Sequence, residues 1–366
     1  MPRPKIVIVG SGILGAATAF HLTNDNAHVT LIDEADIFAP ATPHSFGWIN
    51  AHTPQNQHHF KLRVEAMELW RQLKAQHPDL PVHFPGALDW DMPSDQLEET
   101  VRLYNELGNS AKLLSHAEMR KLAPSASFLP ETAIHCPGDG VAVPEEISSA
   151  FVSLGNGENL VQMQGETVTG LETKNGRVSG VKTTNRTIEA DHVILCCGRK
   201  TNEVLASLNL SVPLDNRAGI LLRTAPLENL ELPIISSPEL HFWQMADGTL
   251  LVGENQAGDS DVANIEVFKQ RICDKLSSFL PQCSKIEFMK HTAGIRPMPS
   301  DTMPVIGVAG EFKNLHVAVM HSGITLAPII GKAITSAIID EKGYKGLEPY
   351  AFDRFVDTQN AGRNLA

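Results

Sequence analysis

The sequence predicts an α/β protein with two domains, one built on a parallel sheet and one on an antiparallel sheet. Three observations predict this fold class. The chain opens with strand, helix and strand patterns, its middle is dominated by strand patterns, and a strand, a glycine turn and a helix recur near its end. At 366 residues the chain is also long enough for two packed domains.

The opening stretch has the pattern of a buried strand, a glycine turn and a helix. Residues 5–9 are mostly β-branched, and Gly10, Gly12 and Gly15 follow with G-x-G-x-x-G spacing. In a unit of this kind the first glycine allows the tight turn, the second lets the backbone approach a diphosphate, and the third lets helix and strand pack closely. The diphosphate then lies on the positive end of the helix.

The second strand of this stretch ends in an acid. Asp33 lies 18 residues beyond Gly15, where a carboxylate accepts hydrogen bonds from ribose hydroxyls and disfavours a 2′-phosphate. The alternative interpretation is a plain tight turn in a fold that binds no nucleotide. Because strands, glycines, helix and acid all agree, the sequence predicts a dinucleotide-binding βαβ unit and leaves the dinucleotide open.

Composition excludes several classes of function. The net charge of −12 and the lack of a Lys/Arg run disfavour nucleic acid and anionic membranes as partners. The five cysteines are odd in number and form no C-x-x-C pair, so we expect reduced thiols of a cytoplasmic protein and no metal site. The first strand starts at Lys5, and polar residues interrupt the apolar stretch 316–339, so we expect neither a secretion signal nor an integral membrane segment.

The first half of the chain continues with a loop over 35–51 and a helix over 58–76. The loop contains Phe46 and Trp48, which are too apolar for a plain surface connection, so we expect it near the cofactor. Short helices follow between 78 and 137. Ser94 is the expected N-cap of a helix over 97–107, and Ser115 with Glu118 has the pattern of a capping box.

Strand patterns dominate the second half, after a helix that we expect Pro144 to open and Leu154 to end. Asn175-Gly176 predicts a hairpin, and a buried strand over 191–197 ends at Gly198. The further expected elements are strands over 217–224, 239–244 and 249–253, a helix over 262–280, and strands over 285–291, 303–307 and 314–319. Successive side chains of a strand point to opposite faces, so Phe242 and Trp243 cannot both point into a pocket.

Taken together, these blocks resemble the FAD-dependent amine and D-amino-acid oxidoreductases, the family that contains glycine oxidase, sarcosine oxidase and D-amino-acid dehydrogenases. The resemblance spans nearly the whole chain and follows the family's order. It rests on Gly10-x-Gly12-x-x-Gly15 with Asp33, Ser45-Phe46-Gly47-Trp48, Cys197-Gly198, Gly294-Ile295-Arg296-Pro297 through Gly307, and His321-Ser322-Gly323 through Pro328.

The resemblance implies a Rossmann-like FAD-binding domain built from discontinuous segments, and an α+β substrate domain whose antiparallel sheet covers the flavin. We expect 1–77, 138–212 and 294–366 to form the FAD domain, and 78–137 and 213–293 to form the substrate domain. Some family members attach FAD through a cysteine near the Gly294 position. Since no cysteine follows Cys283, we expect non-covalent FAD.

The resemblance also implies which residues bind FAD. Val168 would contact the adenine side, residues 45–48 would lie along the flavin, and residues 323–326 would place a positive helix end at the pyrimidine edge, where negative charge gathers on reduction. The full implied set is Gly10, Gly12, Ile13, Leu14, Gly15, Asp33, Glu34, Ser45, Phe46, Gly47, Trp48, Val168, Cys197, Gly198, Gly294, Arg296, Gly323, Ile324, Thr325 and Leu326.

Arg296, His321 and Ser322 are the implied catalytic residues. In several amino-acid-oxidising members, the arginine of the Gly-x-Arg-Pro block forks onto the substrate carboxylate, which suits the planar guanidinium. The alternative is a structural arginine that pairs with Asp301 or another acid. His321 and Ser322 stand next to the flavin by motif position, and their alternative role is packing and backbone hydrogen bonding.

The implied reaction is oxidation of the C–N bond of an amino acid or related amine, such as a D-amino acid, glycine or an N-substituted amino acid. Hydride moves to flavin N5 and leaves an imine that water hydrolyses. The electron acceptor is oxygen or another compound, because Leu251 stands where some members carry an oxygen-activating lysine. Two alternatives are an NAD-dependent dehydrogenase, which shares the opening motif, and a flavin-binding subunit without turnover.

Overall fold

The computed structural model describes residues 3–35, 41–52, 55–254, 259–281 and 286–355. The chain divides into two compact units, each assembled from segments that are far apart in sequence. Unit 1 comprises 1–43, 145–217 and 295–366, and unit 2 comprises 44–144 and 218–294. Segments 44–77 and 138–144, which we expected with the FAD domain, belong to unit 2, where Trp48 pairs with Val141. Segment 213–217, which we expected with the substrate domain, belongs to unit 1.

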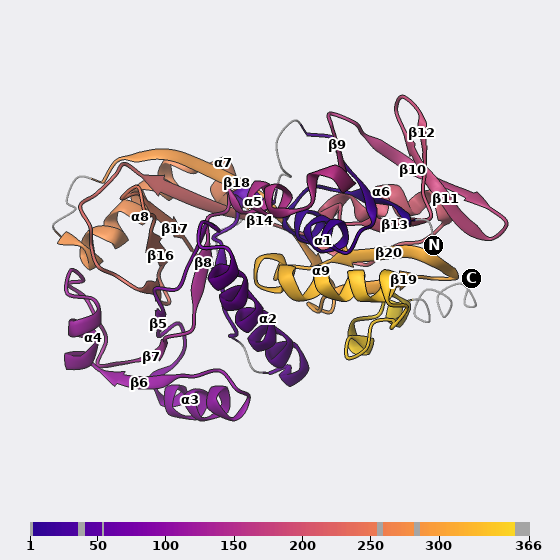
Figure 1. Cartoon of the computed structure of the whole chain (residues 1–366). Coiled ribbons are helices and arrows are strands. Elements are labelled where there is room, and N and C mark those ends of the chain that lie inside the picture. The colour runs from indigo at the N-terminus through magenta and orange to yellow at the C-terminus, as the bar shows by residue number, and fades with distance from the viewer. Residues whose placement is uncertain (1–2, 36–40, 53–54, 255–258, 282–285, 356–366) are drawn as a thin grey trace, which may run out of the picture. The chain divides into compact units, whose positions relative to one another are not determined.

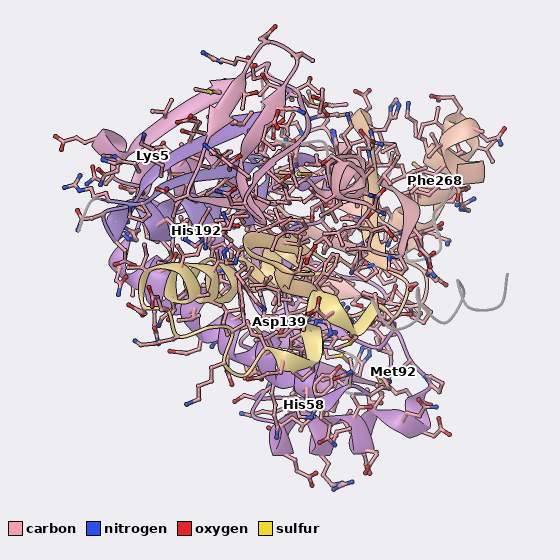
Figure 2. All side chains as sticks on the ribbon, turned by 90° about the vertical axis from the view of Figure 1, so that its right-hand side faces the viewer. Lys5, His58, Met92, Asp139, His192 and Phe268 are labelled. Carbon is pink, nitrogen blue, oxygen red and sulfur yellow. The ribbon has the colours of Figure 1, made fainter. Side chains whose placement is uncertain are left out.

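Unit 1 is organised around a six-stranded sheet in the order β19-β20-β13-β1-β2-β9. Its strands are β1 (Lys5–Val9), β2 (His28–Asp33), β9 (Leu160–Gln164), β13 (His192–Leu195), β19 (Val305–Ala309) and β20 (Phe312–Val319). All neighbours are parallel except β19, which is antiparallel to β20. Lys5 and His192, labelled in Figure 2, mark the amino ends of β1 and β13. The strand order reverses between β1 and β13, and sheets of this type bind ligands at the carboxyl ends of such strands.

The helices of unit 1 are α1 (Ile13–Asn24), α5 (Ile147–Leu154), α6 (Thr201–Leu205) and α9 (Gly323–Ile339). Helices α1 and α9 pack closely, because a Cβ on Gly331 would lie only 2.8 Å from the carbonyl oxygen of Ala17. A separate antiparallel sheet contains β10 (Val168–Lys174), β11 (Arg177–Thr183) and β12 (Thr187–Glu189). Its first turn has Asn175 at φ 53° and Gly176 at φ 73°, which confirms the predicted hairpin.

Unit 2 is organised around an eight-stranded sheet in the order β18-β14-β17-β16-β15-β5-β7-β6. Its strands are β5 (Ala87–Asp89), β6 (Lys112–Ser115), β7 (Thr132–Cys136), β14 (Leu214–Thr224), β15 (Ile234–Ser236), β16 (His241–Gln244), β17 (Leu250–Gly253) and β18 (Phe288–Pro299). The pairs with a described register are antiparallel, except that β15 runs parallel to β5. A parallel α/β sheet in one unit and this sheet in the other confirm the predicted fold class (Figure 1).

The helices of unit 2 are α2 (Gln57–Gln76), α3 (Leu97–Glu106), α4 (His116–Leu122), α7 (Asp259–Ala263) and α8 (Ile265–Phe279). A small sheet joins β3 (Trp48–Ile49), β4 (Val82–His83) and β8 (Gly140–Ala142). Helix α8, with Phe268 labelled in Figure 2, packs on one face of the large sheet and buries Phe242 there. Burial of these side chains drives this packing.

Local signals in the sequence had mixed outcomes. The capping box of Ser115 and Glu118 is present at α4. The N-cap role of Ser94 was wrong, because residues 94–96 form a tighter 3₁₀ turn and Gln96 caps α3. Helix α5 begins at Ile147, three residues later than expected, because residues 144–146 form a turn and Glu146 is the N-cap residue. Cys283 and the first residue of the strand expected over 285–291 lie outside the described residues. No described helix combines the length and apolar character that a bilayer span requires.

Candidate active site

The turn after β1 has a shape that only glycine permits. Gly10 has φ +99°, and a Cβ on it would lie 2.4 Å from the carbonyl oxygen of Cys196 at the end of β13. A Cβ on Gly15 would lie 1.9 Å from the carbonyl oxygen of Gly10. The turn therefore brings the backbone of β1, the start of α1 and the end of β13 together without side chains between them.

The first turn of α1 is left open to a negatively charged group. Gly12 is the N-cap residue and offers no side-chain cap, and the first turn contains no acid. The backbone N–H of Ile13 donates to Thr42 Oγ1 at 3.0 Å, a contact that the sequence did not reveal. The positive end of the helix dipole favours an anion at this position.

Asp33 supports the glycine turn, a role that sequence analysis missed. Its Oδ2 accepts hydrogen bonds from the backbone N–H and the hydroxyl of Ser11 at 2.7 and 2.8 Å, and its Oδ1 accepts from Ala35 at 3.0 Å. A carboxylate has about four acceptor positions, so ribose hydroxyls can still be accepted. The neighbouring Glu34 pairs with Lys200, with 2.6 Å between Oε1 and Nζ.

The strand end after β13 borders the same turn. Cys196 donates its backbone N–H to the carbonyl of Val9 at 2.8 Å, and Cys197 Sγ lies 3.4 Å from that oxygen. Burial raises the pKa of the Cys197 thiol well above its ordinary value, which keeps it protonated. Gly198 follows, and Pro297 lies 3.9 Å from the position of a Cβ on it. Val168 begins β10 and is half-buried.

The N-terminus of α9 lies against the N-terminus of α1. A Cβ on Gly323 would lie 3.6 Å from Ile13 Cγ2 and 3.8 Å from Leu14 Cγ. Ser322 is the N-cap of α9 and makes no side-chain cap, and the first turn has no acid. Residues 323–326 are buried, Ser322 is half-buried and His321 is exposed. Two helix starts without acids therefore meet at one edge of the parallel sheet.

Arg296 lies on β18 and is half-buried. Burial, and next the charge of Arg217, lower the pKa of Arg296. The alternative partner considered for it, Asp301, is bound elsewhere, because its two oxygens lie 2.7 and 3.2 Å from Nε and Nη2 of Arg354. A half-buried guanidinium that lies near a second guanidinium is stabilised by a negatively charged partner.

The remaining predicted residues belong to unit 2. Ser45 Oγ accepts from the N–H of Gly47 at 3.1 Å, and a Cβ on Gly294 would lie 2.9 Å from His44 Cβ, so these two blocks adjoin. Trp243 Nε1 donates to the carbonyl of Phe46 at 3.0 Å. Alternation along β16 thus puts Trp243 and His241 on the face opposite α8, while Phe242 faces that helix.

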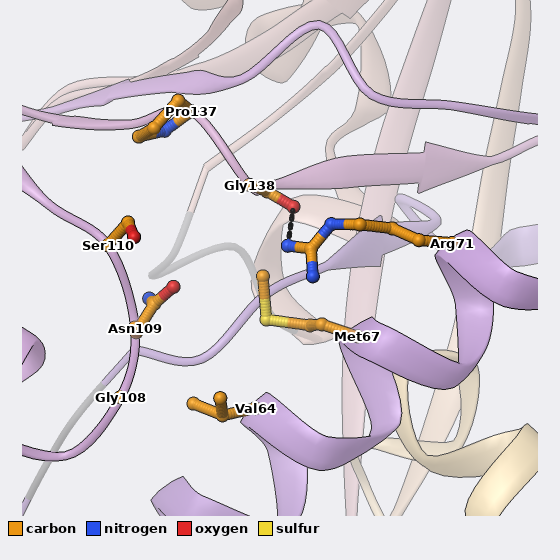
Figure 3. A pocket seen from close by; sticks show the side chains of 8 residues that line it. All are labelled: Val64, Met67, Arg71, Gly108, Asn109, Ser110, Pro137 and Gly138. Atoms are coloured by element: carbon orange, nitrogen blue, oxygen red, sulfur yellow. Dashed lines mark hydrogen bonds between the residues drawn. The ribbon is translucent and has the colours of Figure 1, made fainter.

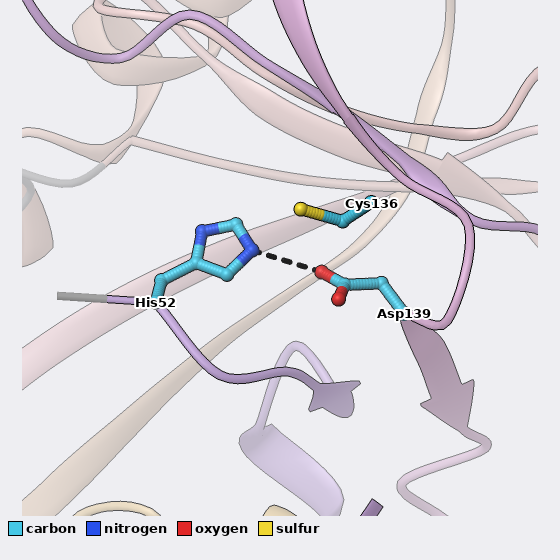
Figure 4. Close-up of side chains that lie close together, drawn as sticks. All are labelled: His52, Cys136 and Asp139. Carbon is cyan, nitrogen blue, oxygen red and sulfur yellow. Dashed lines mark hydrogen bonds and ion pairs between the residues drawn. The ribbon is translucent and has the colours of Figure 1, made fainter. Parts of the chain in front are cut away.

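A buried ionic network in unit 2 was missed by sequence analysis. His52 lies between two carboxylates, with Nδ1 3.0 Å from Asp89 and Nε2 2.9 Å from Asp139. Figure 4 shows the contact with Asp139. Trp48 Nε1 donates to the same Asp139 oxygen at 2.9 Å. Burial alone would lower the pKa of His52, but Tyr104 and the two carboxylates outweigh it and hold this pKa well above its ordinary value.

A pocket with a volume of about 290 Å³ opens beside this network, between α2 and the turn before β8 (Figure 3). Arg71 on α2 donates through Nη2 to the carbonyl of Gly138 at 3.0 Å and fixes that turn. Met67 and Asn109 also line the pocket. The predicted site residues are not among those that line it.

Comparison with known proteins decides the family. Residues 5–337 match the model of the DAO family, described as FAD dependent oxidoreductase. The chain belongs to the DAO family. It is therefore an FAD-dependent oxidoreductase, which excludes the NAD-dependent alternative.

Three similar proteins match this chain over nearly their whole lengths. The chain is 24% identical to the uncharacterized oxidoreductase YurR of Bacillus subtilis, covering 94% of this chain and 97% of that protein. It is 23% identical to glycine oxidase of Pseudomonas putida, covering 95% and 98%. A solved structure of L-amino acid deaminase from Proteus vulgaris superposes with a TM-score of 0.86 at 19% identity, covering 97% and 95%. This last likeness shows the fold.

The residues of unit 1 fit the cofactor of the DAO family. The turn at Gly10 and Gly15 has no room for a Cβ, so a diphosphate can approach bare backbone. The start of α1 offers N–H groups and no acid, and α9 presents a second such start beside it. An elongated dinucleotide with an anionic centre and an electron-accepting ring suits this pair of positive helix ends.

Proposed function

We propose that this chain oxidises the C–N bond of an amino acid or a related amine that carries a carboxylate, such as a D-amino acid, glycine or an N-substituted amino acid. The observation that carries the proposal is the contact between the starts of α1 and α9, at Ile13 and Gly323. Two positive helix ends in contact can serve the two ends of one FAD, its diphosphate and its ring. Glycine oxidase among the similar proteins supports an amino-acid substrate.

We propose that FAD binds without a covalent bond, because no cysteine occurs in 284–366. In this proposal the glycine turn and the N–H of Leu14 hold the diphosphate, and Ile13 lies beside it with its own N–H bound to Thr42. Asp33 binds the ribose through its remaining acceptor positions. The other residues proposed to contact FAD are Gly12, Glu34, Ser45, Phe46, Gly47, Trp48, Val168, Cys197, Gly198, Gly294, Arg296, Gly323, Ile324, Thr325 and Leu326.

When bound, FAD supplies an acceptor for hydride at N5 of its ring. The chain's own contribution is orientation and electrostatics. Arg296 binds the substrate carboxylate in two hydrogen bonds and so fixes the C–H bond that breaks. The start of α9 stabilises negative charge that develops next to it, and the first turn there contains no opposing acid. His321 and Ser322 precede this helix and are proposed to border the substrate.

The experiment is an anaerobic substrate panel on the purified protein with FAD. D-amino acids, L-amino acids, glycine and N-methylglycine are mixed with it in turn, together with matched amines that lack the carboxylate. We expect loss of the visible flavin absorption with at least one carboxylate-bearing amine and with none of its matched amines. Bleaching by the amines alone would contradict the role of Arg296. Bleaching by no compound would favour a flavin-binding subunit without turnover.

Re-admission of air separates the two kinds of electron acceptor. A flavin that re-oxidises rapidly in air indicates an oxidase. One that stays reduced until an artificial dye is added indicates a dehydrogenase. Leu251 on β17 supports the dehydrogenase, since its side chain has no charge to activate oxygen.

A further inference from the structure

Three side chains with metal-ligand atoms converge in unit 2, although the sequence has no metal motif. A ring nitrogen of His52, Sγ of Cys136 and a carboxylate oxygen of Asp139 all lie within 4.8 Å of one another (Figure 4). They come from the segment after β3, the end of β7 and the turn before β8. We propose that these three residues bind one divalent ion of the Zn²⁺ type. This proposal does not depend on the substrate or on the proposed oxidation.

The surroundings of His52 match those of metal-binding histidines. Such a histidine commonly donates its second ring N–H to a carboxylate, which fixes its tautomer and its orientation. Asp89 occupies that position, 3.0 Å from Nδ1. The other nitrogen, Nε2, lies 2.9 Å from Asp139, and in this proposal an ion replaces the proton that these two groups share. The indole of Trp48 donates to Asp139 at 2.9 Å and orients that ligand in turn.

The distances require only a small adjustment. Zinc binds sulfur at about 2.3 Å and imidazole nitrogen at about 2.0 Å, so a tetrahedral site separates these two ligand atoms by about 3.5 Å. The observed separations are at most 4.8 Å. The Cys136 side chain therefore needs to move by no more than about 1.3 Å.

The second oxygen of Asp139 provides an independent observation. The side chain is fully buried, and Oδ1 has no hydrogen-bond partner among the residues that the structure describes. A buried carboxylate oxygen that accepts no hydrogen bond costs free energy. An ion held by both oxygens of Asp139 would remove this cost. Nothing else described near Asp139 donates to Oδ1.

Charge balance and access are compatible with an ion. Zinc binds cysteine as thiolate and histidine as neutral imidazole, so its two positive charges replace protons that these ligands lose. The pocket of Figure 3 reaches the turn between two of the ligands, because its wall includes Pro137 and Gly138, which join Cys136 to Asp139. The turn that carries two of the three ligands is therefore solvent-accessible on one side.

The test uses the full chain with FAD, stripped of metal by a chelator and then titrated with Zn²⁺ in a calorimeter. We expect one tight ion per chain, and at least tenfold weaker binding in Cys136→Ser. Cys273→Ser on α8 is the matched control and should bind as the parent does. Asp89→Asn should weaken binding about 10- to 100-fold, the range seen when such a supporting carboxylate is removed.

X-ray absorption at the zinc edge tests the unaltered protein. The expected shell contains one sulfur at about 2.3 Å together with nitrogen and oxygen at about 2.0–2.2 Å. The sulfur should be missing in Cys136→Ser. Zinc surrounded by nitrogen and oxygen alone in the parent, equal affinity in Cys136→Ser, or no binding at all would overturn the proposal. The last result would leave His52 and its carboxylates as a purely ionic network.

Discussion

Asp139 offers the sharpest test of the buried network in unit 2. Its Oδ2 accepts hydrogen bonds from both Trp48 and His52 at 2.9 Å, and its side chain is fully buried. Replacement of Asp139 by alanine leaves the charged ring of His52 and the indole N–H of Trp48 without their shared carboxylate partner. Removal of one partner from a buried ion pair costs about 3–5 kcal/mol, because the other charge stays buried. Such a loss is a large part of the about 5–15 kcal/mol that stabilises most proteins.

Asp139→Asn separates charge from hydrogen bonding. The amide keeps one acceptor oxygen for the indole of Trp48 but loses the negative charge opposite His52. We therefore expect about 1.5–3 kcal/mol of destabilisation, the usual contribution of a hydrogen bond to a charged group. The surface pair of Asp340 and Lys342, 3.0 Å apart, is the control, and Asp340→Ala should cost under about 1 kcal/mol.

The assay is urea unfolding followed by tryptophan fluorescence, with a chelator present so that no metal contributes. All four tryptophans lie in unit 2, so their emission reports on the unit that contains Asp139. The midpoints should fall in the order parent, Asn variant, Ala variant. If Asp139→Ala lost no more stability than Asp340→Ala, the network would contribute little and the reasoning would be refuted.

Three further predictions concern the cofactor, the substrate and acid stability. Gly12→Val should yield folded protein without flavin, measured by visible absorption, and a yellow variant would contradict the cofactor placement. Arg296→Lys should lower kcat/KM for carboxylate-bearing substrates at least about tenfold while FAD is retained. The exposed Arg102→Lys is the control and should leave kcat/KM unchanged. If Arg296→Lys lowered kcat/KM by less than about threefold, the carboxylate role would be refuted. Burial lowers the pKa of His316 to about 3, below the ordinary 6.5, so the unfolded chain binds the proton more tightly. The contribution of His316 should therefore lower the free energy of unfolding by roughly 2 kcal/mol between pH 7 and pH 5. Unfolding followed by circular dichroism should show a smaller acid loss in His316→Gln. The exposed His28→Gln is the control and should keep the full loss. An equal acid loss in both variants would assign it to other groups.

Local sequence signals succeeded where the interacting residues are close in the chain. The glycine turn after β1, the Asn175-Gly176 hairpin and the capping box at Ser115 each depend on a few consecutive residues. The expected start of α5 was wrong, because residues 144–146 form a turn ahead of the helix.

The candidate site was predictable only in part. The sequence indicated a positive helix start at each end of the chain, but only tertiary structure brings Ile13 to Gly323. It indicated an acid at Asp33 but not the bond to Ser11, 22 residues away. No sequence signal announced that Asp139 pairs with His52 or with Trp48.

By itself, the sequence determined the class of fold, the dinucleotide-binding turn and the resemblance to FAD-dependent oxidoreductases. These follow from residue periodicity and from backbone conformations that few residue types adopt. Tertiary structure alone decided which buried charges neutralise one another, since Asp139 finds its partners 87 and 91 residues earlier in the chain. Burial selects such partners, because a charge removed from water must be paired, and the chain's spacing does not encode which segments burial brings together.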